Sequence, residues 1–515
     1  MTNWVSKQLE RVVLNWIWPF IKPHIDPDQM GGVPGCSVEH YIIKMLHFIL
    51  TSMDGNRDAA VLAVPVDFSK AFNRMLHSEI LCCLSSLNVP PCAIKLIQSY
   101  LSGRSMCLRY KGAESKFERC PGGGPQGGLL TGVLFILQVN KAGRPCPSPG
   151  QNRSILPALS LKEVPQPAPL NESIATSTPI PEGVPHPAQQ QEQQSTPLFT
   201  VEEVQHPSPG QESAPLPLCH LQNKLHKKSF VDDLTLLEKI SLSSLETKTR
   251  IVGPLDYHDR FNLTHPTHKS ILQHQLSDLK IFTNDRHMKL NRIKTKCISF
   301  NNSRTKDFMP QLSLEEGTYL EVINQLKLVG LVVNSSLTWQ PHVDYSVSRV
   351  NSVIWQLVRF KQLGAPREKL ITLYILKVRS ILMFGAVCFH SSLSVELSRK
   401  IELQQKRCLA VILGTEYHSY SSALLLTSLP RLDTLREQTC LKWALKNQLD
   451  PKHSHLFPLT KRVTRTSKKF EEQFCRGSKL YKSAVPSMQR ALNKYYHKED
   501  HSVTITTKSG ISFTV

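Results

Sequence analysis

Three aspartates stand where apolar runs end or are interrupted. Asp67 follows the run L-A-V-P-V, and the pair Asp232 and Asp233 lies inside S-F-V-D-D-L-T-L-L. A buried carboxylate is costly unless a positive charge meets it. If the two runs form neighbouring strands, three carboxylates converge on one sheet face and repel one another unless cations neutralise them. Such hard oxygen ligands suit Mg²⁺, and a pair of Mg²⁺ ions suits phosphoryl or nucleotidyl transfer.

A simpler interpretation of these aspartates stays open at this stage. An Asp that merely caps or ends a strand is common, and Asp67 by itself fits that description. The Asp-Asp pair has apolar residues on both sides, so it fits a buried site as well as a strand end. The choice between the two interpretations depends on the surrounding motifs.

The flanking segments have the pattern of a mixed α/β protein. L-A-V-P-V-D-F-S from Leu62 predicts a strand, and M-C-L-R-Y-K predicts a shorter one. The other predicted elements are buried helices from Val12 and His40, amphipathic helices from His77 and Cys92, a G-G-G-P-Q-G-G turn from Gly122 that leads into an apolar helix, and about a hundred helical residues beyond Pro341. The strand that should pair with residues 230–237 is hard to find, because H-L-Q-N-K-L-H-K-K from His220 is a poor candidate.

Charge and cysteine usage bound the class of protein. The 515 residues include 62 Lys and Arg against 41 Asp and Glu, a net charge of +21, which favours a polyanionic partner, either nucleic acid or an anionic membrane surface. The 13 cysteines show no C-x-x-C spacing, which argues against a zinc module and a disulfide scaffold and for a reducing compartment. No signal peptide is visible, and the apolar run 129–139 is too short to cross a bilayer. We expect an intracellular protein without a membrane partner, in either the nucleus or the cytoplasm.

Two segments differ in composition from the rest. Residues 143–222 hold 16 of the 34 prolines in four units of 20 residues, which predicts an extended disordered insert rather than a leucine-rich solenoid. The insert has three basic and seven acidic residues, so the rest of the chain carries a net charge of 21 + 4 = +25.

The C-terminal segment is strongly basic. From Pro451 onward there are 13 Lys and Arg and four Asp and Glu, and we expect a basic tail over 451–515.

The motifs V-D-F-S-K-A-F-N at Val66, G-P-Q-G-G at Gly124 and F-V-D-D at Phe230 occur in this order, and together they resemble the reverse transcriptases of non-LTR retrotransposons. The resemblance runs from Ser6 to about Gly414. It includes D-P-D-Q-M-G-G, S-Y-L-S-G-R, L-N-R-I-K-T-K and L-V-G-L-V-V…L-T-W-Q-P-H-V. It implies an α+β right-hand polymerase: partial fingers over 1–60, a palm over 61–335 interrupted by the insert, and a helical thumb or connection over 336–450.

The resemblance also implies a role for each matching residue. Asp67 and Asp232 would bridge two Mg²⁺ ions, with Mn²⁺ as a substitute, and Asp233 would be the accessory carboxylate. The backbone carbonyl of Phe68 would bind one metal, and the ring of Phe72 would pack under the incoming sugar and exclude a 2′-hydroxyl.

Further positions would contact the substrates. Gln126 would lie against the nascent base pair, Arg104 would contact template or phosphate, and Lys294 would donate a proton to the leaving pyrophosphate. Leu328 to Val333 would form the hairpin that grips the primer end, with Leu328, Val329 and Gly330 as the primer grip. Plain core for Phe72, a solvated side chain for Arg104 and a surface lysine for Lys294 are the alternatives.

Three departures from the family bear on activity. The chain opens at S-K-Q-L-E without the preceding fingers segment or an endonuclease domain; Asn73 replaces an acidic residue; and Gln126 and Asp232 are 106 residues apart. We expect an RNA-directed DNA polymerase that uses an RNA template, a DNA primer and deoxynucleoside triphosphates, impaired by the truncation and the insert. The alternatives are a catalytically silent nucleic-acid-binding remnant and an interaction protein whose Pro-rich repeats bind aromatic-groove domains.

Overall fold

A computed structural model describes most of the chain outside the Pro-rich segment. The described residues are 4–56, 59–120, 122–125, 127–140, 225–230, 233–241, 271–301, 312–315, 317–461, 468–498, 504–506 and 512–514. The predicted disorder of 143–222 concerns residues outside these ranges. The same holds for Gln126 and Asp232, while Asp233 is described for its backbone alone.

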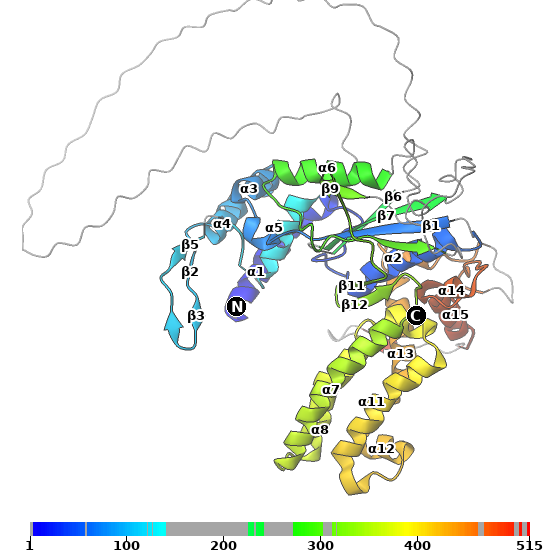
Figure 1. Cartoon of the computed structure of the whole chain (residues 1–515). Coiled ribbons are helices and arrows are strands. Elements are labelled where there is room, and N and C mark those ends of the chain that lie inside the picture. The colour runs from blue at the N-terminus through cyan, green and yellow to red at the C-terminus, as the bar shows by residue number, and fades with distance from the viewer. Residues whose placement is uncertain are drawn as a thin grey trace, which may run out of the picture. The chain divides into compact units, whose positions relative to one another are not determined.

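A four-stranded antiparallel sheet lies at the centre of the described fold (Figure 1). Its order is β6 (Leu225–Phe230), β7 (Asp233–Ser241), β1 (Ala59–Val66) and β8 (Ile298–Asn301). β1 pairs with β7 from Ala59↔Ser241 to Val66↔Leu234. The apolar sequence of β1 follows from this central place, because both of its faces are covered.

The partner strand β6 corrects an expectation from the sequence. The L-H-K-K end of the segment judged a poor candidate continues through Ser229 and Phe230 as β6, which pairs with β7 over its whole length, from Leu225↔Glu238 to Phe230↔Asp233. β6 is an edge strand, and an edge strand satisfies only one ladder and often carries lysines that block further pairing. A search of the sequence for an apolar run, which is typical of a central strand, therefore does not find β6.

The two faces of β1 belong to two hydrophobic cores, because successive side chains of a strand point to opposite faces. Val61 and Ala63 face a large core that includes α2 (Val38–Met53) and the C-terminal helices. Leu62, Val64 and Val66 face a second core. This second core takes side chains from α1 (Trp4–Ile21), α3 (His77–Ser86), α4 (Pro91–Leu101), α5 (Leu129–Val139) and α6 (Ile271–Asp285).

Helix α1 is less buried than the sequence predicts. Val13, Ile17 and Ile21 form its buried stripe, and the helix contacts α5. Val12 and Trp16 remain 66% and 43% exposed. The apolar residues cover more of the helix than one packed face can bury, since a helix presents a new side chain every 100°.

Two buried glutamates cap helices that flank the sheet. The Glu10 carboxylate accepts a hydrogen bond of 3.0 Å from the Leu130 backbone N–H in the first turn of α5. The Glu238 carboxylate accepts bonds of 3.2 Å each from the Ile271 and Leu272 N–H groups at the start of α6. Negative charge at a helix N-terminus satisfies orphan donors and complements the helix dipole, so both contacts fix a helix against a strand or a neighbouring helix.

Short strand pairs complete the α/β part. A ribbon extends beyond α4 (Figure 1) and contains β2 (Ser105–Met106), β3 (Arg109–Tyr110), β4 (Ala113–Glu114) and β5 (Glu118–Arg119). The other pairs are β9 (Ser313–Glu315) with β10 (Thr318–Tyr319), β11 (Gln325–Leu328) with β12 (Leu331–Asn334), and β13 (Thr504–Thr506) with β14 (Ser512–Thr514).

The predicted helical region beyond Pro341 is confirmed. It contains α7 (Gln340–Gln362), α8 (Arg367–Leu373), a π-helical stretch (Tyr374–Arg379), α9 (Ser380–Met383), α10 (Ala386–Phe389), α11 (Val395–Leu413), α12 (Tyr420–Thr427) and α13 (Leu432–Asn447). Within the described residues, the run 367–392 is long and apolar enough to span a membrane, a criterion that core helices also meet. Its Tyr374, Val378 and Leu382 side chains are buried in the large core.

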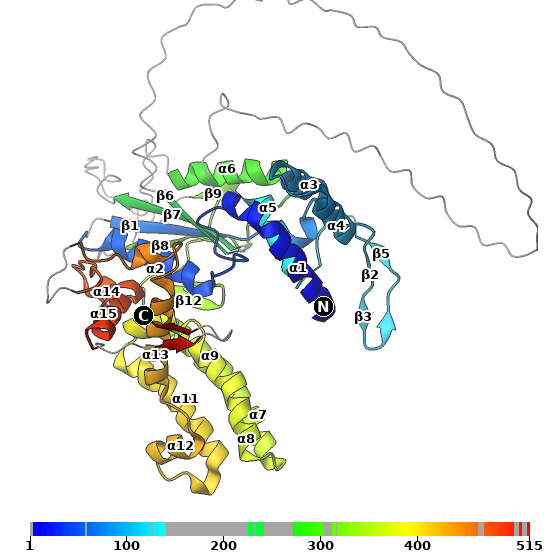
Figure 2. The same ribbon diagram turned by 180° about the vertical axis from the view of Figure 1, so that it is seen from behind.

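The predicted basic tail is not an appendage. Its described parts, 451–461 and 468–498, include α14 (Ser478–Tyr481) and α15 (Ala484–Lys498), which contact α2, and α15 also packs on α13 (Figure 2). Phe457, Phe470 and Leu492 lie in the large core. Despite its high Lys and Arg content, this segment has enough apolar residues to pack against the core. Its charge alone therefore does not predict whether it folds.

Candidate active site

Asp67 occupies the first position after β1, as the sequence predicts. The last pair of the β1–β7 ladder is Val66↔Leu234, so the next step of the same register sets Asp67 opposite the first residue of β7, Asp233. Opposed positions of antiparallel strands share a face of the sheet and lie about 4.5–5.5 Å apart at Cα. The structure therefore brings the backbones of two predicted carboxylate positions together at one end of the sheet.

The L-N-R-I-K-T segment is fixed on the same end of β1. The Asn291 N–H donates to the Asp67 carbonyl at 2.7 Å, and the Ser69 N–H donates to the Lys289 carbonyl at 2.7 Å. The Asp67 N–H donates to the hydroxyl oxygen of Thr295 at 3.3 Å. Two of these hydrogen bonds hold the loop against the backbone of Asp67 itself, and the third holds it against Ser69, two residues further on.

This loop delivers Lys294 to the carboxylate. The Lys294 Nζ lies 3.6 Å from the Asp67 Oδ2, and the two side chains are 68% and 34% exposed. The interaction is accessible to solvent, so the ion pair by itself stabilises the fold little. The ion pair matters because of where it places the lysine. The Lys294 ammonium lies beside Asp67, the predicted metal ligand, although the two residues are 227 positions apart in the sequence.

The glycine-rich turn docks on the segment after Asp67. The Gly123 N–H donates to the Met75 carbonyl at 2.9 Å, and the Gly124 N–H donates to the Phe72 carbonyl at 3.0 Å. A Cβ at Gly123, whose φ is +78°, would lie 2.8 Å from the Phe72 carbonyl oxygen, so this close approach requires glycine. The neighbouring Gln126 lies outside the described residues, although its flanking turn is anchored beside Phe72.

Both predicted phenylalanines pack on α5. The Phe68 side chain is 6% exposed, and its ring meets the Phe135 ring edge-on at 6.4 Å. The half-buried Phe72 lies in the 3-10 helix η2 (Ala71–Arg74), with its ring 5.0 Å from the same Phe135 ring. Phe135 is a supporting residue that the sequence reasoning missed, because an apolar helix gives no local sign of which ring it will contact.

The remaining predicted residues lie on separate elements. Arg104 is half-buried at the base of the ribbon, where its carbonyl accepts a hydrogen bond of 2.8 Å from the Cys120 N–H. Val329 and Gly330 form the two-residue turn of the β11–β12 hairpin with φ of 45° and 91°. Leu328, at the end of β11, is 4% exposed and belongs to the large core, so it supports the turn from inside the protein.

The donor set at the end of β1 suits a divalent cation. Among the described side chains, no group of three or more His, Cys, Asp and Glu could hold a metal ion, but the Asp232 and Asp233 side chains are not part of that set. Carboxylates opposite each other on neighbouring strands repel unless a positive charge lies between them. Asp67 is accessible, its register partner is an aspartate, and oxygen donors are what Mg²⁺ prefers.

Comparison with known families agrees with this geometry. Residues 1–152 match the family model described as "Reverse transcriptase (RNA-dependent DNA polymerase)". The matched part contains α1, α2, β1 with Asp67, the ribbon and the turn before α5. The match supports a reverse transcriptase, which is an RNA-directed DNA polymerase and a nucleotidyltransferase. A domain of this family implies a nucleic acid template and primer and nucleotide substrates in general. A search among curated proteins gave no match.

Proposed function

We propose that the chain is an RNA-directed DNA polymerase of the non-LTR retrotransposon type, which extends a primer 3′-hydroxyl by two-metal nucleotidyl transfer. The observation that carries the proposal is the convergence at the end of β1. The β1–β7 register aligns Asp67 with Asp233, and the L-N-R-I-K-T loop sets the Lys294 ammonium 3.6 Å from the Asp67 carboxylate. Two carboxylate positions and a cation are what transfer of a polyanionic triphosphate needs.

Within this proposal, Asp67, Asp232 and Asp233 hold the cations. Bound Mg²⁺ ions would supply charge stabilisation at the attacking and leaving oxygens. Lys294 neutralises negative charge near the triphosphate and gives a proton to the leaving pyrophosphate. Phe72, held on Phe135, packs under the sugar, and the Gly123–Gly124 backbone keeps the glycine-rich turn beside it.

Other regions serve the nucleic acid. The β11–β12 turn, with Val329 and Gly330, grips the primer end, and α7 and α11 form a thumb along the duplex. The fingers, palm and thumb assignments rest on the motif order together with these elements. We further propose that the protein acts inside the cell, as its cysteine usage suggests.

Primer extension tests the proposal. The purified chain, given an RNA template, a DNA primer, deoxynucleoside triphosphates and Mg²⁺, should show weak but detectable extension of the primer. Asp67→Asn and Asp232→Asn should each reduce extension at least about 100-fold, since the loss of a ligand at the reacting centre removes several kcal/mol of transition-state stabilisation.

A matched control is Asp285→Asn, an exposed carboxylate at the end of α6. It should leave extension unchanged. Extension that survives Asp67→Asn would reject the site. Binding of primer–template without any extension, in all variants alike, would instead favour the catalytically silent nucleic-acid-binding remnant.

A further inference from the structure

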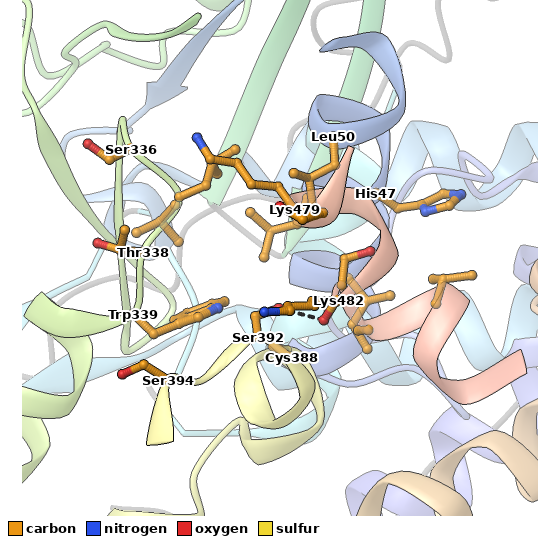
Figure 3. A pocket seen from close by; sticks show the side chains of 18 of the residues that line it. His47, Leu50, Ser336, Thr338, Trp339, Cys388, Ser392, Ser394, Lys479 and Lys482 are labelled. Atoms are coloured by element: carbon orange, nitrogen blue, oxygen red, sulfur yellow. Dashed lines mark hydrogen bonds between the residues drawn. The ribbon is translucent and has the colours of Figure 1, made fainter. Parts of the chain in front are cut away.

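A cavity of about 390 Å³ lies between α2, the β12–α7 junction and the C-terminal helices (Figure 3). Its size is within the range of small-molecule sites. Its wall comes from four separate stretches of the chain, 43–50, 333–340, 388–397 and 478–485, so it exists only in the folded protein. The lining includes His47 of α2, Trp339 at the β12–α7 junction, and the two lysines Lys479 and Lys482.

The floor of this cavity is aliphatic. Ile43, Leu46 and Leu50 present one ridge of α2, and they are 1%, 8% and 9% exposed. Val333 and Val485 close the other sides. The Trp339 ring packs against His342 and Phe389 and is only 6% exposed, so it offers little surface on which a planar base could stack. The floor therefore suits an alkyl chain better than a nucleobase.

The rim carries positive charge and no carboxylate. Lys479 and Lys482 line the cavity from α14 and the turn after it, and no Asp or Glu is among the lining residues. Figure 3 shows both lysine side chains extending toward the β12–α7 junction, where Ser336, Thr338 and Trp339 lie. Neither ammonium group has an ion-pair or hydrogen-bond partner among the described residues. Burial lowers the pKa of His47 to about 4, so its imidazole adds no charge at neutral pH.

We propose that this cavity binds a single-chain aliphatic carboxylate, with the alkyl chain between α2 and the β12–α7 junction and the carboxylate at Lys479 and Lys482. The aliphatic floor favours the alkyl chain of the ligand. The two lysine ammonium groups, on a rim without Asp or Glu, favour its negatively charged carboxylate. The proposal is independent of the polymerase assignment, because none of these residues belongs to the proposed active site.

Calorimetric titration of the full chain tests this site. The probes are octanoate and decanoate below their micelle concentrations, with decanol and decylamine as neutral and cationic ligands of equal chain length. Decanoate should bind at one site per chain, and tighter than octanoate by about fourfold for each added methylene. Decanol should bind more weakly than decanoate, and decylamine should not bind.

Lysine variants distinguish binding at this cavity from unspecific attraction of an anion to a basic protein. Lys479→Gln and Lys482→Gln should each weaken decanoate two- to fivefold, the range expected for exposed ion pairs, and leave decanol unchanged. Lys369→Gln, an exposed lysine of α8, should change neither ligand. Equal affinity for decanoate and decanol, equal effects of the three lysine variants, or binding of many ligands per chain would overturn the proposal. Binding to phosphatidylserine vesicles without binding of monomeric decanoate would also overturn it and point to a membrane surface.

Discussion

At the scale of single residues, Lys294 shows how a loop can place a charge with precision. Its own contact with Asp67 is solvent-exposed and weak, but the loop that carries it is fixed by hydrogen bonds from Asn291 and Ser69 and to Thr295. A rigidly held backbone around a weak ion pair is typical of a side chain that contacts a ligand. It is not typical of a side chain whose main role is to stabilise the fold.

Substitution of Lys294 should therefore affect rate more than folding. Lys294→Gln should lower the rate of primer extension about 10- to 100-fold, as expected for the loss of a general acid, with little change in thermal midpoint. Lys296→Gln, in the same loop, removes an ion pair of 2.6 Å with Glu321 and should leave the rate unchanged. Single-turnover kinetics and thermal unfolding measure both quantities. Equal effects of the two variants on rate would show that Lys294 is a surface lysine.

At the scale of secondary-structure elements, buried carboxylates set the positions of α5 and α6 beside the sheet. Glu10 is 4% exposed, and its bond to the Leu130 N–H links α1 to the helix that supports Phe72. Glu10→Ala should lower the free energy of unfolding by about 1–2 kcal/mol, as for the loss of a helix cap. Lys7→Ala, on the exposed face of the same helix, is the control. Urea unfolding measures both, and equal midpoints would contradict a capping role.

Buried histidines make two other helices, α2 and α7, sensitive to acid. Burial lowers the pKa of His342 to about 4, where its ring packs between Trp339 and Phe389. Between pH 6.5 and 4 the unfolded state binds a proton that the folded state does not, so stability must fall as the pH decreases through this range.

The change from pH 6.5 to 4.5 should cost about 2 kcal/mol for His342, at about 1.4 kcal/mol per pH unit. His342→Phe should flatten the pH dependence of the urea midpoint over this range, while the exposed His418→Asn should keep it. A dependence equally steep in both variants would assign the acid sensitivity to other groups, among them His47, whose pKa burial also lowers to about 4.

At the scale of the whole molecule, the C-terminal segment is structural. Leu456, Phe457, Phe470, Val485, Met488 and Leu492 are 5% exposed or less and belong to the large core. At about 1.5–3 kcal/mol for each buried side chain, the loss of all six is as large as the whole stability of an ordinary domain. Deletion of residues 451–515 should therefore abolish cooperative unfolding, which scanning calorimetry would detect. A truncated chain with an unchanged transition would show the packing to be dispensable.

Since deletion unfolds the core, charge substitutions must test whether this segment binds nucleic acid. Lys461 and Lys494 are exposed. If both contact phosphate, replacing them by glutamine should reduce the slope of log affinity against log salt by about 1.8. An unchanged slope would show that their charges are solvated.

The sequence by itself determined the local elements and suggested the chemistry that the proposed function rests on. The strand before Asp67, the Gly123–Gly124 turn and the helices beyond Pro341 follow from periodicity and turn residues, which are properties of neighbouring positions. The tertiary structure decided which distant segments meet. β6 could not be recognised because an edge strand needs only one partner, and the packing of 451–498 was hidden by its charge. The contact of Lys294 with Asp67, and the cavity beside α2, depend on segments hundreds of residues apart, and no local pattern encodes a distance between them.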